Sequence, residues 1–201
     1  MIRVLIAEDQ AMVRGALKAL IGLETDMEVV AEVARGDQVV DAARTSNPDV
    51  ALLDIEMPGA DGIAAAALLR QNYPQCRSLI LTTFGRPGFL RRAMESGAAG
   101  FLLKDAPPHE LAVAIRRTIK GERVVDPGLA AAALAEGMSP LSEREREVLS
   151  ATDRGASIPE IARTLFLSEG TVRNHLSAAI QKLGARNRAE AARLADQKGW
   201  L

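Results

Sequence analysis

Apolar residues in the first 120 positions fall into two kinds of run. Short runs bounded by turn residues are typical of buried parallel strands, and runs with apolar residues every three or four positions predict amphipathic helices. The expected strands are residues 2–7, 29–33, 50–53, 78–81 and 97–103, and the expected helices lie near residues 12–21, 37–45, 63–70, 88–96 and 111–119. This alternation predicts an α/β domain with a five-stranded, doubly wound parallel sheet.

The alternation stops at Gly121. Asp126-Pro127-Gly128 interrupts the pattern, residues 129–135 are rich in alanine and suit a short linker helix, and residues 136–140 are typical of a loop. We therefore expect a first domain over residues 1–121, a linker over 122–138 and a second domain over 139–201.

The second domain is predicted to be all-α. Ser142 and Ser157 each begin an S-x-x-E sequence, which is the pattern of a capping box at a helix start. Ser168 is placed to cap a third helix, whose buried stripe comprises Val172, Leu176, Ala179, Ile180 and Leu183.

Charge and cysteine content narrow the class of protein. The net charge is −1, but residues 171–201 carry six Lys or Arg against two acidic residues, which suggests a segment that faces nucleic acid. The single cysteine, Cys76, excludes an internal disulfide and disfavours a cysteine-based zinc site. No apolar stretch has the length of a membrane span and no signal peptide is evident, so we expect a cytoplasmic protein.

Polar residues stand directly after four of the expected strands. They are Glu8 and Asp9, Asp54, Thr82 and Lys104. Because parallel strands point the same way, these strand ends should meet at one edge of the sheet. Asp54 taken alone could be a solvated carboxylate or a helix cap, but the repeated coincidence favours a shared site.

The residue types indicate the chemistry of that site. Clustered carboxylates favour a hard cation that prefers oxygen ligands, of which Mg²⁺ is the natural candidate. Lys104 adds a positive charge and Thr82 a neutral donor. Such a site stabilises a phosphoryl group, and Asp54 would be the nucleophile that forms an aspartyl phosphate.

Residues 1 to about 121 resemble the receiver domain of bacterial two-component response regulators, which has a flavodoxin-like fold. The resemblance rests on an acidic pair, a phosphoacceptor aspartate, a hydroxyl residue and a lysine in that order: Glu8 and Asp9, Asp54, Thr82, and Lys104. One departure is Asp105, because many receivers have a proline after the lysine in a cis peptide. Because a cis bond before a residue other than proline costs about 3–4 kcal/mol, the sequence alone does not fix the conformation of that peptide.

The resemblance implies roles for single residues. Asp9, Asp54 and the backbone carbonyl of Glu56 would bind Mg²⁺, and Glu8 would contribute through water. Phe101 matches the aromatic position that rotates together with Thr82 on activation. A sensor histidine kinase would donate the phosphoryl group.

The third helix of the second domain has a polar face opposite its buried stripe. Small, polar and amide residues on that face, flanked by Arg173, suit a helix in a DNA major groove, although any exposed helix face is polar. Residues 139–201 resemble the LuxR-type helix-turn-helix domain, with S-E-G-T-V-R-N-H at positions 168–175 as the most specific segment. The resemblance implies that Thr171 binds DNA, that Arg173, Asn174 and Ser177 face bases, and that Lys182, Arg186 and Arg188 lie near phosphates.

A receiver joined to a LuxR-type domain defines the NarL/FixJ class of response regulators. This resemblance implies a transcription factor rather than an enzyme, which would form a homodimer on phosphorylation and bind double-stranded DNA at an inverted repeat. One alternative is a phosphohydrolase with an aspartate nucleophile, but Glu56 matches its second acid imperfectly and no substrate cap is evident. Another is a DNA-binding protein that works without phosphorylation, which the complete set of strand-end residues disfavours.

Overall fold

The computed structural model describes residues 1–83, 85–135, 139–153 and 155–201. The chain divides into two compact units, residues 1–85 with 90–131 and residues 86–89 with 132–201. Each unit contains its own buried core, and each is described separately. Within the described residues, no helix is both long and apolar enough to cross a membrane.

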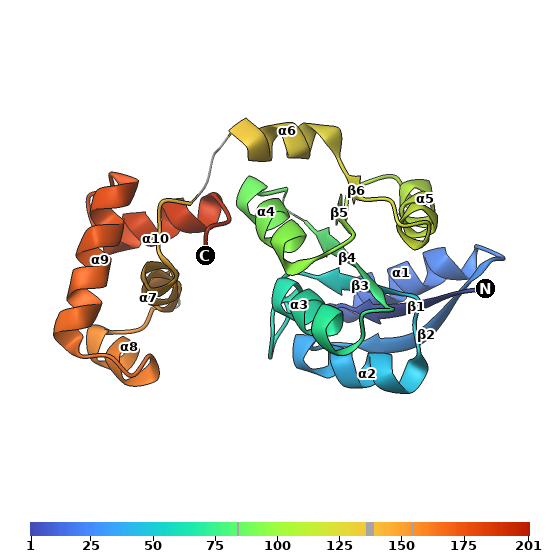
Figure 1. The fold of residues 1–201 in the computed structure, drawn as a ribbon, viewed down its shortest axis with the longest axis horizontal. Helices are drawn as coiled ribbons and strands as arrows, with labels where there is room; N and C mark the ends of the chain where they lie inside the picture. Colours follow the sequence, from blue (N-terminus) through green and yellow to red (C-terminus); the bar gives the residue numbers. More distant parts are fainter. Residues whose placement is uncertain (84, 136–138, 154) are drawn as a thin grey trace. The chain divides into compact units, whose positions relative to one another are not determined.

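The first unit is built on a parallel sheet with the strand order β2-β1-β3-β4-β5-β6 (Figure 1). The strands are β1 (Ile2–Ala7), β2 (Met27–Val33), β3 (Val50–Asp54), β4 (Arg77–Thr82), β5 (Gly100–Leu103) and β6 (Val124–Val125). All five strands expected from the sequence are present, and the α/β prediction is confirmed. The change of direction in strand order lies between β1 and β3, where open sheets of this kind bind ligands.

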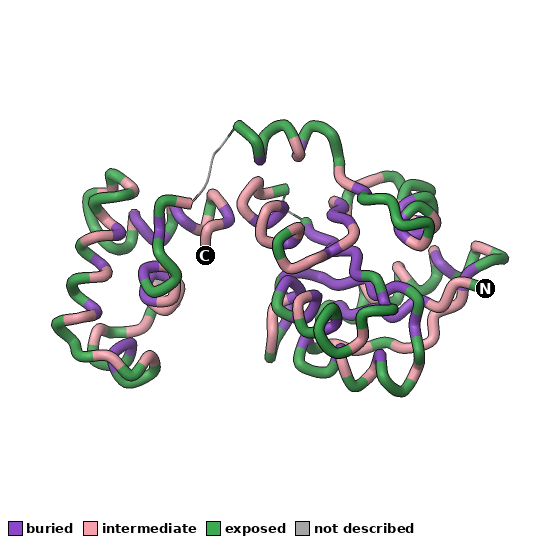
Figure 2. The backbone as a smooth tube through the Cα atoms, in the orientation of Figure 1, coloured by how far each residue is buried: buried purple, intermediate pink, exposed green. Residues whose placement is uncertain are grey.

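Helices cover both faces of this sheet (Figure 1). They are α1 (Ala11–Gly22), the 3₁₀ turn η1 (Gly36–Gln38) with α2 (Val39–Ser46), α3 (Gly62–Asn72), α4 (Pro87–Ser96) and α5 (Pro108–Ile119). Ile21 of α1 and Ile115 of α5 pack in one cluster with Val4, Leu52 and Leu79 of the sheet. The central strands are buried along their whole length, as Figure 2 shows, so their apolar runs do not alternate with polar residues.

Most observed strands differ from the expected ranges by one or two residues, and two differences are larger. The strand expected from Gly97 begins at Gly100, because Gly97 has a positive φ and ends α4 in a turn. β6 was not expected, and it lies inside the segment assigned to the linker. It pairs with β5 through Gly100–Val124 and Phe101–Val125. A strand of two residues is too short to give a periodic signal in the sequence.

The remainder of the expected linker forms α6 (Pro127–Ala135), which agrees with the alanine-rich composition there. Asp126 stands before this helix and accepts a hydrogen bond from the Leu129 amide at 2.8 Å. Residues 136–138 of the expected loop lie outside the described residues.

The second unit contains α7 (Glu143–Asp153), α8 (Ile158–Thr164), α9 (Glu169–Leu183) and α10 (Arg188–Gln197). The first S-x-x-E pattern forms a capping box: the Ser142 amide donates to Glu145, and the Glu145 amide donates to the Ser142 hydroxyl. The Ser168 hydroxyl accepts from the Thr171 amide at 3.0 Å, as expected for the cap of α9. Val172, Leu176 and Ala179 of the expected stripe are buried in the core of this unit.

Candidate functional site

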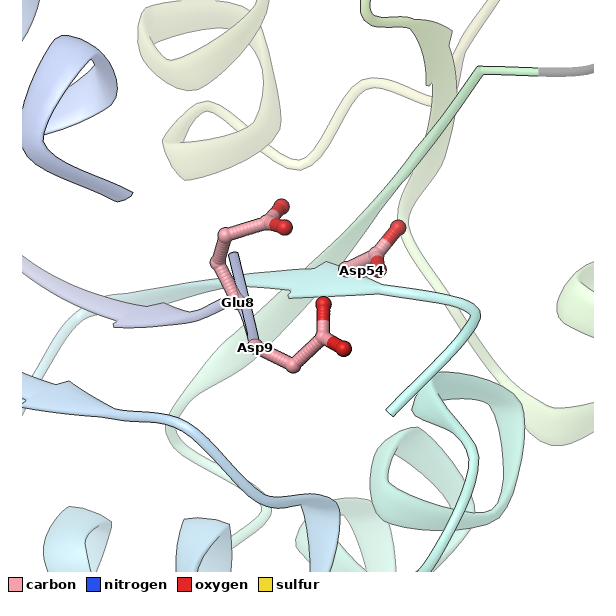
Figure 3. Close-up of side chains that lie close together, drawn as sticks. All are labelled: Glu8, Asp9 and Asp54. Carbon is pink, nitrogen blue, oxygen red and sulfur yellow. The ribbon is translucent and has the colours of Figure 1, made fainter. Parts of the chain in front are cut away.

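Three carboxylates meet at the carboxyl edge of the sheet in the first unit, at the ends of β1 and β3. Oxygen atoms of Glu8, Asp9 and Asp54 lie within 4.8 Å of one another, and Figure 3 shows the three side chains turned toward the same space. The meeting follows from the pairing of β1 with β3, in which Ala7 is opposite Leu53. Glu8 and Asp54 are buried, whereas Asp9 is exposed. Within the described residues, this is the only acidic cluster of that closeness.

Lys104 brings a positive charge to the two buried carboxylates. Its Nζ lies 2.6 Å from Oε2 of Glu8 and 2.8 Å from Oδ1 of Asp54. The side chain of Lys104 is 13% exposed, so its ammonium reaches the acids from an almost covered position. The lysine stands directly after β5, whose residue Leu103 pairs with Thr82 at the end of β4.

Burial dominates the electrostatics of this cluster. It raises the pKa of the Glu8 carboxyl and of the Asp54 carboxyl, although hydrogen bonds with Lys104 act in the opposite direction. For Lys104, burial lowers the pKa, but the hydrogen bonds to Asp54 and Glu8 together outweigh it and raise the pKa. One ammonium therefore does not compensate three carboxylates, and the site is suited to a further cation.

Of the remaining residues predicted at this site, Thr82 and Glu56 lie at the same edge of the sheet, whereas Phe101 lies within a strand. Thr82 is the last residue of β4 and is 4% exposed. Phe101 is fully buried in β5, where it pairs with Ile80. Glu56 lies in the exposed loop after β3. No peptide bond in the described residues is cis, so the bond between Lys104 and Asp105 is trans.

Two glycines that sequence reasoning missed hold the loop after β3 in place. The Gly36 amide donates to the Pro58 carbonyl at 3.1 Å, and a Cβ at Gly36 would lie 1.9 Å from the Ala60 carbonyl oxygen. A Cβ at Gly62 would lie 2.0 Å from the Asp54 carbonyl oxygen. No local sequence pattern predicts these contacts, because each joins backbone segments that meet only in the folded domain.

A second candidate surface is the exposed face of α9. Arg173, Asn174 and Ser177 are exposed, opposite the buried stripe. Arg173 pairs with Glu169 one turn earlier at 2.8 Å, and this exposed pair leaves the guanidinium accessible from solvent. Thr171 is half-buried and its hydroxyl contacts that of Ser168 at 2.8 Å.

The three expected phosphate contacts have different surroundings. Nζ of Lys182 lies 2.9 and 2.8 Å from the two carboxylate oxygens of Glu145, which is buried. Lys182 therefore links α9 to the start of α7, a role that the sequence did not suggest. Arg186 pairs with Glu190 and stays exposed, and Arg188 begins α10 on the surface.

Comparison with known protein families agrees with the two units. Residues 4–116 match the response regulator receiver domain. Residues 139–195 match the LuxR family of bacterial regulatory proteins. Together these matches contain every residue of the acidic cluster, Lys104 and the whole of α9.

Similar proteins cover the full length of the chain. The transcriptional regulatory protein DesR of Bacillus subtilis is 46% identical over 201 residues and is covered completely, as is this chain. The crystal structure of ChrA, a response regulator of a heme-sensing two-component system, is 37% identical with a TM-score of 0.59 over 100% of this chain and 98% of ChrA. The RcsB–DNA complex is 25% identical, with a TM-score of 0.66 and 98% coverage of both chains.

Proposed function

The chain belongs to the two-component response regulators that join a receiver domain to a LuxR-type DNA-binding domain, and on this premise we propose that it is a transcription factor switched by phosphorylation of Asp54. The observation that carries the proposal is the position of Asp54. Its carboxylate is buried at the carboxyl edge of the sheet, beside two further acids and 2.8 Å from the Lys104 ammonium.

The cluster fits Mg²⁺ as a cofactor. Oxygen ligands from carboxylates and a backbone carbonyl are the donors that this cation prefers, and an excess of two negative charges remains after pairing with Lys104. Asp9, Asp54 and the Glu56 carbonyl would hold the ion, with Glu8 acting through water. When bound, Mg²⁺ neutralises charge on the transferring phosphoryl oxygens.

The chain's own residues would carry out the transfer of the phosphoryl group. An oxygen of Asp54 attacks the phosphorus of a phosphohistidine on a sensor kinase, and the new P–O bond forms as the P–N bond breaks. The departing imidazole takes up a proton. Lys104 already lies beside the attacking carboxylate, so it stabilises the phosphoryl oxygens without moving far. Thr82 supplies a hydroxyl donor from the end of the neighbouring strand.

Phe101 and Thr82 would convert this local change into a signal. A hydroxyl drawn toward the phosphoryl group leaves space beside the strand, and Phe101 turns into it from its buried position. Phosphorylation would stabilise the active conformation of the receiver more than the inactive one, and so would shift the population toward the active state.

The output is DNA binding by α9. Arg173, Asn174 and Ser177 would face bases, and Thr171 would contact DNA beside them. Arg186 and Arg188 would lie near phosphates, as would Lys182, whose side chain stays partly exposed while it pairs with Glu145. We assign the receiver to residues 1–121 and the DNA-binding domain to residues 139–201, with a connecting segment over 122–138 whose strand β6 extends the receiver sheet. A homodimer would occupy an inverted repeat in double-stranded DNA in the cytoplasm.

Labelling with acetyl phosphate tests this proposal. Asp54→Asn should abolish covalent labelling, because an amide is not a competent nucleophile, and EDTA should abolish labelling of the wild type. Asp41→Asn is the matched control, since Asp41 is an exposed acid on α2. Undiminished labelling of Asp54→Asn, or steady turnover of a generic phosphate ester by the wild type, would contradict the assignment.

A further inference from the structure

The helices of the DNA-binding domain end in a common way. In each, the amide of a residue with positive φ donates to the carbonyl three positions earlier, and the next amide donates to the carbonyl five positions earlier. This is the Schellman motif, whose left-handed residue is usually glycine. Glycine occupies that position after α7, α9 and α10, as Gly155, Gly184 and Gly199, but after α8 the residue is Phe166.

The backbone at Phe166 is in the left-handed region, with a φ of 55°. The amide of Leu167 donates to the Ala162 carbonyl at 2.9 Å, which closes the motif. Left-handed backbone is unfavourable for residues with a Cβ, and asparagine is among the few that tolerate it. Among the described residues, Asn47 is the only other non-glycine residue with positive φ.

Packing does not offset this cost. The Phe166 residue is 95% exposed, so its ring contributes no burial to the core of its own domain. A single exposed apolar side chain needs no special explanation. An exposed aromatic ring held on an unfavourable backbone is different, because glycine or asparagine would suit the fold better. The exposed ring on this backbone favours a role for phenylalanine in contact with another molecule.

The position of Phe166 indicates which molecule. It stands two residues before Ser168, the cap of α9, and so lies at the entrance to the helix that we assign to the major groove. Its exposed neighbours Arg163 and Thr164 are polar or cationic. Within the described part of residues 139–201, Phe166 is the only large apolar residue that is exposed, which fits a contact with DNA better than an apolar protein interface.

We propose that Phe166 packs against DNA at the edge of the groove that α9 enters, on deoxyribose carbons or a thymine methyl group. This inference rests on the proposed DNA-binding function and adds an apolar contact to its polar ones. Apolar side chains, phenylalanine among them, recognise the thymine methyl in the major groove.

Variants of Phe166 test this inference, and their stability and their affinity for DNA are measured separately. The probe is a duplex that acetyl-phosphate-treated wild-type protein enriches from a random pool, together with the same duplex containing uracil in place of thymine. Phe166→Asn should unfold at the same or a higher denaturant concentration, followed by fluorescence of Trp200, the only tryptophan. It should bind the duplex roughly 5- to 100-fold more weakly, the range expected for one specific contact. Phe166→Tyr, which keeps the ring, should bind nearly as the wild type does.

The duplexes distinguish the two apolar partners. If uracil weakens wild-type binding but not that of Phe166→Asn, the ring contacts a methyl group; if uracil has no effect, it contacts sugar. Asn174→Ala serves as a control that weakens binding through a polar contact. If Phe166→Asn and the wild type bind the duplex with equal affinity, the inference is wrong although the proposed function stands. If Phe166→Asn is less stable than the wild type, the backbone at position 166 does not disfavour phenylalanine, and the premise of the inference is wrong. A wild type that enriches no duplex would overturn both.

Discussion

Gly36 contacts the loop that follows β3 and thereby bears on the acidic cluster. It lies between β2 and α2, yet its amide donates to Pro58 in the loop that carries Glu56. A methyl group at Gly36 would overlap the Ala60 carbonyl oxygen at 1.9 Å, and the obstruction is backbone rather than a flexible side chain. The loop that supplies the Glu56 carbonyl therefore depends on a residue that lies 20 positions earlier and bears no functional group.

We expect Gly36→Ala to displace this loop and weaken Mg²⁺ binding. Acetyl phosphate labelling measured against Mg²⁺ concentration should show a half-saturating concentration raised several-fold, and overpacking of this kind costs about 1–3 kcal/mol of stability. Gly15→Ala is the matched control, because a Cβ at Gly15 in α1 meets nothing within 4 Å. An unchanged Mg²⁺ dependence in Gly36→Ala would show that the loop does not position a ligand of the ion.

At the scale of elements, the ion pair of Glu145 with Lys182 joins the start of α7 to the last turn of α9. Glu145 also accepts the Ser142 amide that caps α7, so a single buried carboxylate serves two helices. Burial would raise the pKa of the Glu145 carboxyl, but the hydrogen bonds from Lys182 and the Ser142 amide together lower it. The orientation of α9 is thereby tied to the charge of one acid.

This ion pair predicts a pH dependence of stability. The pKa of Glu145 is lower in the folded protein than in the unfolded chain, where it is about 4.3. The charged carboxylate therefore adds to the free energy of unfolding at any pH above about 4.3. This stabilisation is lost as the pH falls through the pKa of the folded state. Glu145→Gln should reduce stability at pH 7 by about 1–3 kcal/mol, and the difference from wild type should shrink below about pH 4.5.

Urea unfolding followed by Trp200 fluorescence measures this difference, because Trp200 packs on the core of the DNA-binding domain. Glu147→Gln is the control on the same helix, since Glu147 forms only an exposed pair with Arg144. A difference that stays constant as the pH is lowered from 7 to about 3 would show that Glu145 does not contribute as a charged group.

For the whole molecule, the small size of the DNA-binding domain limits the affinity of a monomer for DNA. One domain of four helices reaches few bases, whereas two held together gain an effective-concentration advantage of roughly 10²–10⁴-fold. We therefore expect phosphorylation to act mainly by dimerisation. Wild-type protein treated with acetyl phosphate should sediment as a dimer and bind an inverted repeat, whereas Asp54→Asn should remain a monomer.

A fragment of residues 139–201, which has its own core, separates dimerisation from release of the DNA-binding domain by the receiver. If dimerisation dominates, the fragment should bind DNA no better than unphosphorylated full-length protein. Tighter binding by the fragment would show that release contributes. Phosphorylated protein that stays monomeric on and off DNA would refute dimerisation.

Much of this protein follows from its sequence because the decisive signals are local. Apolar runs that end in Glu8, Asp54, Thr82 and Lys104 predict the strands, and parallel pairing then brings their ends together by topology alone. Hydroxyl groups three residues before an acid, as at Ser142, predict helix starts because the capping bond spans a single turn. Fold class, the acidic cluster and the exposed face of α9 could therefore be predicted from short-range signals and the general topology of parallel sheets.

Other features depend on segments that meet only in the tertiary structure. A two-residue strand such as β6 has no period to detect, and it exists because β5 offers a free edge. Lys182 has the sequence context of a phosphate contact, but 37 residues separate it from the buried acid that it neutralises. The approach of Gly36 to Ala60 and the exposure of Phe166 likewise depend on what surrounds each residue in space. Local sequence sets backbone preference and periodicity, whereas burial and long-range partners are properties of the packed chain.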